Sequence, residues 1–171
     1  MIHLNIGSNL SSKFGSRFDN ITIAIDLLLS AKVKIKKISN FYETPSYPNK
    51  RFPNYLNVGV LCSFNENPKI LFKLIKSIEK KIGRFKSKKN HPRVCDIDII
   101  DYNSDIVKKD FLTIPHSRCH TRNFVLYPIK EIDPNWIHPI LGQNVNNLIK
   151  KLDFKSRIEI TRLSKNVNIS L

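Results

Sequence analysis

Apolar residues recur at two spacings along this chain, and these spacings predict a series of strands and helices. One helix face is indicated by apolar residues three and four apart: Phe14, Phe18, Ile21, Ile25 and Leu28. Ser16, with Asp19 three residues later, is a signal for the start of that helix. A short first strand is expected ahead of it, over residues 3–7.

Apolar runs with strand-like alternation predict three more strands: residues 33–42, 56–64 and 94–102. Asn67 followed by Pro68 is typical of a helix N-terminus, and Gly83 marks the expected end of that second helix. The core face of the helix is formed by apolar side chains: Ile70, Leu71, Leu74, Ile75, Ile78 and Ile82. Residues 43–54 contain three prolines and should form a long loop.

After the strand over residues 94–102, residues 106–107 are expected to pair back on it and residues 112–115 to be extended. Two further helices are expected, over residues 122–131 and 145–152. The element order is therefore β-α-β-β-α-β followed by helices, which is the ferredoxin-like split pattern. It predicts an α+β fold with an antiparallel sheet and helices packed mainly on one face. One domain, 1–171, is expected. Residues 153–171 fit no element, although Ile158, Ile160 and Leu163 could pack as an extra edge.

Composition and charge narrow the class of protein. The chain has 171 residues and a net charge of +15, and 41% of its residues are hydrophobic. No apolar run is long enough to span a membrane and no segment has the pattern of a signal peptide, so we expect a soluble, cytoplasmic protein. Cys62, Cys95 and Cys119 form no C-x-x-C pair, which argues against a disulfide framework and a zinc site. The charge fits either a phosphate-rich partner or lysines spread over the surface.

Asp96 and Asp98 are the first chemical signal. Residues two apart on a strand share a face, so both carboxylates should point together while Cys95, Ile97 and Ile99 point into the core. Carboxylates about 6.7 Å apart repel unless a cation lies between them, and Mg²⁺ favours one or two carboxylates plus substrate phosphates. Taken alone, the pattern is explained better by two aspartates on a solvated sheet face.

A basic loop directly precedes the aspartates. Residues 83–93 contain two arginines, Arg84 and Arg93, and three lysines. Arginine suits planar, bidentate recognition of phosphate, and cations beside two acids are what a magnesium-bound triphosphate requires. The chain has no Walker-type glycine-rich loop and no protein-kinase signature set, which excludes those two classes.

An ordered set of short motifs runs from about residue 4 to about residue 152: Ile6-Gly7-Ser8-Asn9-Leu10, Phe41-Tyr42-Glu43-Thr44-Pro45, Tyr55-Leu56-Asn57, Ile78-Glu79, Gly83-Arg84, Pro92-Arg93, Asp96-Ile97-Asp98, Pro115-His116 and Arg122-Asn123-Phe124. This set resembles the 6-hydroxymethyl-7,8-dihydropterin pyrophosphokinase family. The resemblance implies a ferredoxin-like enzyme of folate biosynthesis. It would transfer the terminal two phosphates of ATP to the hydroxymethyl group of the pterin and release AMP.

The resemblance also implies a role for each matching residue. Asp96 and Asp98 would hold two Mg²⁺ ions, and Arg84 and Arg93 would stabilise charge on the transferring group. The nucleotide would be bound by Lys76, Glu79, Lys86, Thr113, His116 and Arg122. The pterin would be bound by Thr44, Pro45, Tyr55, Asn57 and Phe124, with the two aromatic rings stacking and the asparagine amide contacting the ring edge. We expect small-molecule substrates, no membrane or nucleic-acid partner, and a monomer.

Some positions depart from the family pattern. Lys76 stands where relatives often carry a glutamine, and Ser117 replaces a common tyrosine. Asn90 and its neighbours stand where an aromatic residue and further arginines often occur. These departures fall at the expected nucleotide contacts and leave the acid pair untouched. They motivate one alternative, a relative that has lost catalysis and serves as a structural or interaction protein.

A second alternative is a basic nucleic-acid-binding module. A ferredoxin-like sheet with exposed aromatic residues is also an RNA-recognition architecture, and Phe41, Tyr42 and Tyr55 fall on expected strands. Against this alternative, the chain shows no RNP-like motif, and Asp96 and Asp98 would repel phosphates without a metal.

Overall fold

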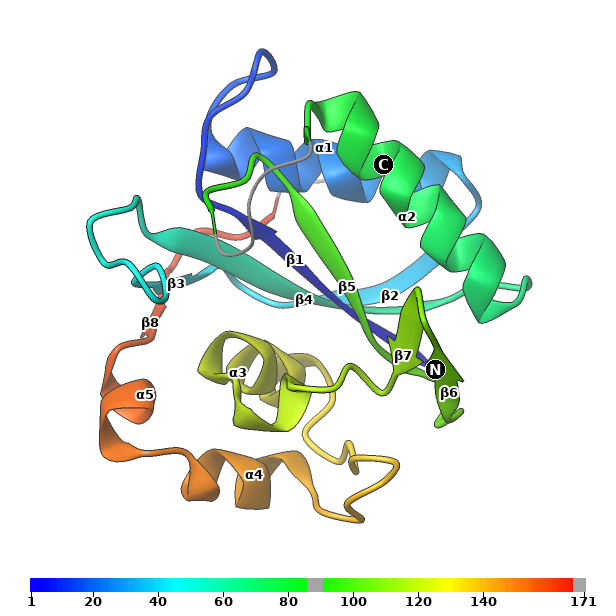
Figure 1. The fold of residues 1–171 in the computed structure, drawn as a ribbon, viewed down its shortest axis with the longest axis vertical. Coiled ribbons are helices and arrows are strands. Elements are labelled where there is room, and N and C mark those ends of the chain that lie inside the picture. The colour runs from blue at the N-terminus through cyan, green and yellow to red at the C-terminus, as the bar shows by residue number, and fades with distance from the viewer. Residues whose placement is uncertain (86–90, 168–171) are drawn as a thin grey trace.

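The structure is a computed structural model that describes residues 1–85 and 91–167 (Figure 1). Its strands are β1 Ile2–Ser8, β2 Lys34–Ile38, β3 Tyr42–Thr44, β4 Tyr55–Ser63, β5 Asp96–Tyr102, β6 Val107–Lys109, β7 Leu112–Ile114 and β8 Thr161–Arg162. Its helices are α1 Arg17–Ser30, α2 Pro68–Ile82, α3 Asn123–Ile132, α4 Val145–Lys151 and α5 Phe154–Ile158, with a 3-10 turn at Cys119–Thr121. The predicted α+β class is confirmed. No helix among the described residues is long and apolar enough to cross a membrane.

One antiparallel sheet lies at the centre of the molecule, with β1 between β4 and β5 (Figure 1). The strand expected over residues 33–42 is in fact two strands, β2 and β3, which pair with successive parts of β4. The break falls where Ser39 Oγ accepts the Gly59 N–H at 2.9 Å and where Phe41 turns into the core. Likewise, Val107 does not pair back on β5, because β6 and β7 form a hairpin of their own.

Helices cover both faces of the sheet, which corrects the expectation that they lie mainly on one face. α1 and α2 pack on one face, and α3, with α4 behind it, packs on the other (Figure 1). All seven residues of β1 and seven of the nine in β4 are buried, and strands buried on both sides need cover on both sides. On the α3 side Gly59 permits a close approach, since a Cβ there would lie 2.9 Å from Pro128 Cβ.

The ends of the helices place the basic loop beside the sheet. The predicted capping box of Ser16 and Asp19 begins α1. Asn67 caps α2, as predicted, and Gly83 ends it with a φ of 110°, a left-handed conformation that favours glycine. Because α2 stops there, Arg84 leaves the helix next to the start of β5.

The end of the chain adds an element to the edge of the sheet, as its apolar residues suggested. β8 pairs with β3, and Leu163 packs against the main core. Ile158, in contrast, is 60% exposed and does not take part in that packing.

Candidate active site

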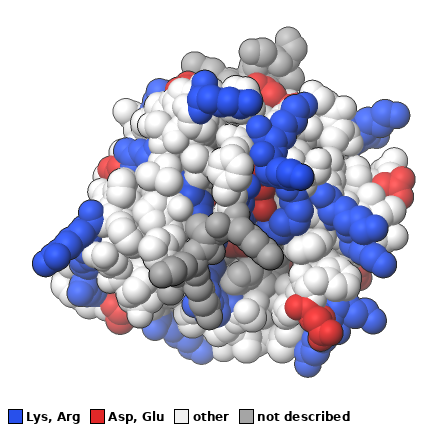
Figure 2. Space-filling model, turned by 45° about the horizontal axis from the view of Figure 1, so that its top comes forward, with Lys and Arg blue, Asp and Glu red and all other residues white. Residues whose placement is uncertain are grey.

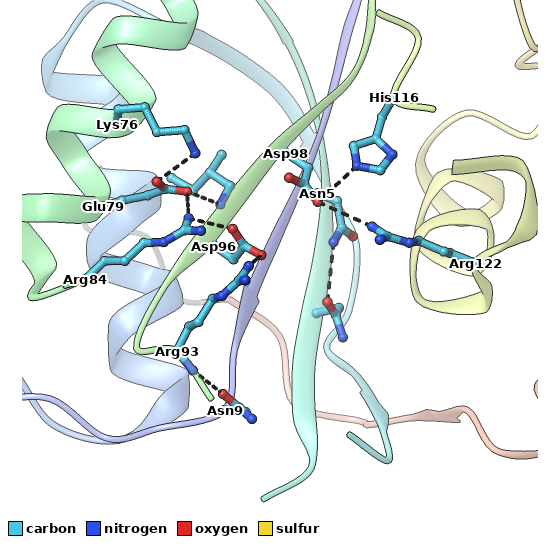
Figure 3. Close-up of polar contacts among 12 residues, drawn as sticks. Asn5, Asn9, Lys76, Glu79, Arg84, Arg93, Asp96, Asp98, His116 and Arg122 are labelled. Carbon is cyan, nitrogen blue, oxygen red and sulfur yellow. Dashed lines mark hydrogen bonds and ion pairs between the residues drawn. The ribbon is translucent and has the colours of Figure 1, made fainter. Parts of the chain in front are cut away.

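Asp96 and Asp98 lie together on one face of β5, with Arg93 and Arg122 reaching toward them from either side (Figure 3). Ile97, between the two acids, is buried in the core under α1 and α2, as the predicted alternation requires. The side chain of Asp96 is 22% exposed and that of Asp98 is 27% exposed. The pair therefore forms a partly open acidic floor.

Arginines hold both oxygens of Asp96. Arg84 Nη1 donates to Oδ1 at 2.6 Å, and Arg93 Nη1 donates to Oδ2 at 2.7 Å. Burial opposes the charge on Arg84, but the carboxylates of Asp96 and Glu79 outweigh it and raise the pKa of Arg84. Hydrogen bonds between ionised partners are among the strongest in proteins. The two arginines that flank the basic loop thus converge on one acid.

Glu79 lies behind these arginines and not in the open cleft. Its side chain is 2% exposed and accepts hydrogen bonds from Ile97 N–H at 2.8 Å, from Lys76 Nζ at 2.8 Å and from Arg84. A buried carboxylate requires such partners. The expectation that Glu79 faces the cleft and contacts the nucleotide is therefore corrected. Its oxygens are bound within the protein, where they position Arg84 and Lys76.

Asp98 receives no hydrogen bond from any described residue. Its Oδ2 lies 3.7 Å from Arg122 Nη1 and 3.9 Å from His116 Nε2, beyond hydrogen-bonding range. Burial at the floor of the cleft, together with the charge of Asp96, raises the pKa of Asp98 to about 7. A carboxylate in this position is stabilised when a cation takes the place of its proton.

His116 is neutral near pH 7. Burial and the nearby cations Arg122 and Arg118 lower its pKa to about 4. Its Nδ1 accepts the Arg118 N–H at 3.2 Å, so the ring proton is assigned to Nε2, the nitrogen on the Asp98 side. The residue therefore presents a neutral donor to the cleft and not a positive charge.

A cavity of about 640 Å³ adjoins the aspartates. Its lining includes all five residues expected to bind the pterin: Thr44, Pro45, Tyr55, Asn57 and Phe124. Arg122 lines it too, with its guanidinium carbon 5.3 Å from the centre of the Phe124 ring. Residues from three separate parts of the chain thus meet around one space.

Two buried amides, Asn5 and Asn57, face each other across β1 and β4 in this cavity. Asn5 Nδ2 donates to Asn57 Oδ1 at 3.3 Å. Asn57 Nδ2 and Asn5 Oδ1 have no hydrogen-bond partner among the described residues. Gly7 leaves room for the pair, since a Cβ there would lie 2.9 Å from Asn57 Oδ1. One donor and one acceptor beside the cavity are therefore left without a protein partner.

A smaller cavity of about 240 Å³ also reaches Asp98. Three residues expected to bind the nucleotide line it: Lys76, Thr113 and His116. Ser117, one of the departures from the family pattern, lines it as well. Asp98 belongs to both cavities, so the two spaces meet at the acid pair.

Basic side chains surround a hollow in which acidic atoms are visible (Figure 2). Arg93, Arg118 and Arg122 line the larger cavity, and Lys76 lines the smaller one. Lys86, which was expected to bind the nucleotide, lies outside the described residues, as does Asn90. The cleft thus combines an acidic floor with a basic rim, a combination suited to a metal-bound polyphosphate.

The sequence interpretation missed Asn5, Asn9 and Arg118. Asn9 Oδ1 accepts the Arg93 N–H at 2.6 Å, and Asn9 Nδ2 donates to the Pro53 carbonyl at 3.2 Å. Through these two hydrogen bonds, Asn9 connects the backbone at Arg93 with the proline-rich loop. Asn5 could have been predicted as a neighbour of Asn57 only from the pairing of β1 with β4, which strand alternation within β1 does not reveal.

The aromatic residues considered for nucleic-acid stacking do not form an exposed platform. Phe41 is 1% exposed and Tyr42 is 6% exposed, and the Tyr42 hydroxyl donates to Glu131 at 2.6 Å. Tyr55 lines the larger cavity. A single-stranded nucleic acid needs open aromatic faces on which bases can stack. The nucleic-acid alternative therefore loses its structural basis on this sheet.

Cys119, His120 and His138 form a second group of potential metal ligands, which no sequence spacing indicated. Their ligand atoms lie within 4.8 Å of one another. However, His138 Nδ1 accepts the N–H groups of Ile140 and Leu141 at 3.2 Å, which assigns the ring proton to Nε2. Burial raises the pKa of the Cys119 thiol to about 12. Because neither ring nitrogen of His138 then offers a free lone pair, we assign no metal to this cluster.

The acid pair, in contrast, fits a hard cation such as Mg²⁺. Carboxylate oxygens are the ligands that Mg²⁺ prefers. Asp98 has no hydrogen-bonded partner among the described residues, and its raised pKa reflects both burial and the nearby charge of Asp96. Asp96 keeps lone pairs beyond the two that its arginines use. Both residues are therefore candidate metal ligands.

The chain matches a protein-family model and several curated proteins. Residues 3–134 match the family described as 7,8-dihydro-6-hydroxymethylpterin-pyrophosphokinase. The chain is 36% identical over 139 residues to 2-amino-4-hydroxy-6-hydroxymethyldihydropteridine pyrophosphokinase of Aquifex aeolicus, covering 81% of this chain and 84% of that protein. It is 38% identical over 148 residues to folic acid synthesis protein FOL1 of Dictyostelium discoideum. That match covers 86% of this chain but only 22% of the longer protein.

Solved structures share the fold. The structure of Plasmodium falciparum HPPK-DHPS with pteroate matches with a TM-score of 0.72 at 14% identity, over 94% of this chain and 47% of that chain. The wild-type structure of the same protein matches with a TM-score of 0.68 at 16% identity. At such low identity the likeness concerns the fold alone, and it agrees with the α+β class.

Proposed function

The chain belongs to the 7,8-dihydro-6-hydroxymethylpterin-pyrophosphokinase family, and on this premise we propose that it transfers pyrophosphate from ATP to the hydroxymethyl group of 6-hydroxymethyl-7,8-dihydropterin. The products are AMP and the pterin pyrophosphate, and the pathway is folate synthesis. The two cavities that meet at Asp98 are the sites for the two substrates.

The observation that carries this proposal is the pair of buried amide groups without a partner, Asn57 Nδ2 and Asn5 Oδ1. A flat heterocycle with a donor and an acceptor on one edge, such as a pterin, would satisfy both groups. Tyr55 and Phe124 line the same cavity and would stack on the ring. The backbone of the Thr44–Pro45 segment would contact the same edge of the ring.

The nucleotide is assigned to the smaller cavity. Lys76 and Thr113 line it, and His116 would donate its Nε2 proton to a phosphate oxygen. Arg122 lines the larger cavity, with its Nη1 3.7 Å from Asp98 Oδ2, and would contact the phosphates from that side. Lys86 joins the assignment through the family resemblance alone.

Asp96 and Asp98 would hold the magnesium that accompanies ATP, and we propose two ions. Metal held by these two carboxylates would neutralise negative charge on the triphosphate. The place of Asp98 on both cavities supports this role, because the transferring phosphates must reach from the nucleotide to the pterin.

The reaction then depends mainly on positioning and charge. The pterin hydroxyl oxygen attacks the β-phosphorus of ATP, and its proton is released. The bond between the β-phosphorus and the oxygen that bridges it to the α-phosphorus breaks, so AMP leaves with the bonding electron pair. Arg84 and Arg93 would exchange their bonds with Asp96 for phosphate oxygens, while Glu79 keeps Arg84 in place.

A direct test combines the purified protein, magnesium-ATP and the pterin, and separates the nucleotides by chromatography. AMP should form only when the pterin is present, and Asp98→Ala should abolish it without unfolding the protein. Asp105→Ala, at an exposed aspartate in a turn after β5, is the matched control and should remain active. A folded protein that forms no AMP would contradict the proposal and favour a relative without catalysis.

A further inference from the structure

The C-terminal segment contributes to the larger cavity although it lies beyond the matched residues 3–134. Ser156 and Glu159 line that cavity together with Pro45 and Tyr47 of the proline-rich loop. In Figure 1 the segment runs from α4, through α5, to β8 beside β3, and so passes from the side of the sheet covered by α3 to the edge of the sheet. Its role can therefore be inferred from the contacts that it makes along this path.

One end of the segment is attached to the α3 wall of the cavity. Asn123 Nδ2 donates to the Ser156 carbonyl at 2.6 Å, and the Tyr127 hydroxyl donates to the Arg157 carbonyl at 3.4 Å. Asn123 directly precedes Phe124, which we propose to stack on the pterin. These contacts therefore hold α5 beside the aromatic wall of the site.

The other end is attached to β3. β8 pairs with β3, and the Leu163 N–H just beyond it donates to the Phe41 carbonyl at 2.8 Å. Arg162 Nε donates to Glu131 Oε2 at 3.2 Å, on α3. Because β3 continues directly into Thr44 and the proline-rich loop, this attachment supports the strand from which the loop departs.

Between these two attachments, Glu159 contacts the proline-rich loop itself. Lys50 Nζ donates to Glu159 Oε1 at 2.5 Å, with side-chain exposures of 54% and 30%. The base of the loop is closed by Ser46 Oγ, which donates to the Pro53 carbonyl at 2.5 Å. The Lys50–Glu159 pair thus links the middle of the loop to the C-terminal segment.

We propose that residues 154–162 form the outer wall of the pterin cavity and that the Lys50–Glu159 pair positions the proline-rich loop for pterin binding. This inference rests on the proposed function of the cavity. Glu159 acts through the loop and not on the reacting atoms, so it is a positioning residue. The smaller cavity includes no residue of this segment. The pair should therefore affect pterin affinity and leave nucleotide affinity unchanged.

The expected effects are modest because both side chains are partly exposed, and exposed ion pairs contribute little. Glu159→Gln should weaken pterin binding about twofold. Glu159→Lys, which places two cations together, should weaken it about fivefold, since the lost attraction and the new repulsion add. Lys50→Glu, which places two carboxylates together, should do the same.

The test measures two dissociation constants by calorimetry: that of the pterin in the presence of a saturating non-hydrolysable ATP analogue, and that of the analogue itself. The variants are Glu159→Lys, Lys50→Glu and the double exchange of both residues. The matched control is Glu66→Lys, at an exposed glutamate whose carboxylate makes no hydrogen bond or ion pair among the described residues. We expect both single variants to weaken pterin binding, and the double exchange to restore it to within about twofold.

Three results would overturn the inference: unchanged pterin binding in both single variants, equal weakening of pterin and analogue, or a double exchange as weak as the single variants. Failure of the proposed function would look different. In that case the wild-type protein would bind the analogue but no pterin, and the inference would fall with it.

Discussion

The two sides of the cleft meet different electrostatic requirements. The arginine side consists of Asp96, Arg84 and Arg93. Both arginines donate short hydrogen bonds to the Asp96 carboxylate, so each of these charged groups has a partner within the protein. On the amide side, Asn57 Nδ2 and Asn5 Oδ1 have no partner among the described residues. Leaving a buried charge unpaired costs about 3–5 kcal/mol, whereas an unsatisfied dipole costs about 1–3 kcal/mol. The fold can therefore leave dipoles available for a ligand more easily than charges.

This difference implies two modes of binding. In the proposed function, the amide side would accept a flat, neutral ligand without rearrangement, whereas the arginine side would exchange hydrogen bonds to the Asp96 carboxylate for bonds to phosphate. Asp98 is the exception on the charged side, because none of the described residues donates a hydrogen bond to it. Its pKa of about 7 shows the consequence, since burial favours binding a proton where no cation is bound.

The largest effect on the rate of AMP formation is expected when the carboxylate of Asp96 is removed. Asp96→Asn should lower the rate of AMP formation by about 10³-fold, because a metal ligand and the organisation of two arginines are lost together. The free energy of unfolding should fall by about 1–3 kcal/mol, less than for a fully buried pair because the Asp96 side chain is 22% exposed. Chromatography of the nucleotides and urea unfolding measure the two quantities. Asp105→Asn is the control, and a wild-type rate in Asp96→Asn would remove this side of the cleft from the reaction.

On the amide side, Asn57→Ala should raise the KM for the pterin about 10- to 100-fold, because a ligand edge is left without its buried partner. The KM for ATP should not change, since Asn57 lines only the larger cavity. Steady-state kinetics with each substrate varied in turn separates the two values. Asn65→Ala, at an exposed position in the turn before α2, serves as the control. An equal rise in both KM values would mean that the two sides do not bind different substrates.

The smallest expected effect concerns the pH dependence of magnesium binding at Asp98. With a pKa of about 7 in the metal-free protein, Asp98 carries a proton at pH 6 that Mg²⁺ must displace. The affinity for Mg²⁺ should therefore be about tenfold weaker at pH 6 than at pH 8. The stability of the metal-free protein should change with pH in the opposite direction. The raised pKa of Asp98 adds to the free energy of unfolding at low pH, and this contribution is lost as the pH rises through 7. Added Mg²⁺ should accordingly raise the melting temperature more at pH 8 than at pH 6.

Thermal unfolding with and without Mg²⁺ at the two pH values checks this expectation, and Asp98→Asn supplies the control because it has no carboxylate to titrate. A Mg²⁺-induced shift in melting temperature that is the same at both pH values would show that Asp98 does not hold the metal. The same shift in Asp98→Asn as in the wild type would lead to that conclusion as well.

Local patterns in the sequence predicted the elements that carry the arginine side. The alternation around Ile97 placed Asp96 and Asp98 on one face, and Gly83 marked the end of α2 immediately before Arg84. Such predictions succeed because strand and helix periods, and the glycine at a helix end, depend on residues close together in the chain.

Predictions failed where the outcome depended on distant residues. Glu79 was expected in the cleft, but the N–H of Ile97 and two cations draw its carboxylate inward. The helices were expected mainly on one face, but the strands bury both faces and α3 covers the second. Neither result follows from the spacing of residues within one element.

By itself, the sequence determined the α+β class, the family, the acid pair and most of the residues that line the two cavities. Only the tertiary structure decided which groups are paired and which are free. It showed both oxygens of Asp96 bound by arginines, Asn5 opposite Asn57, and the C-terminal segment against the larger cavity. The physical reason is that hydrogen bonds and ion pairs between distant segments depend on strand register and chain closure, which the whole fold determines together.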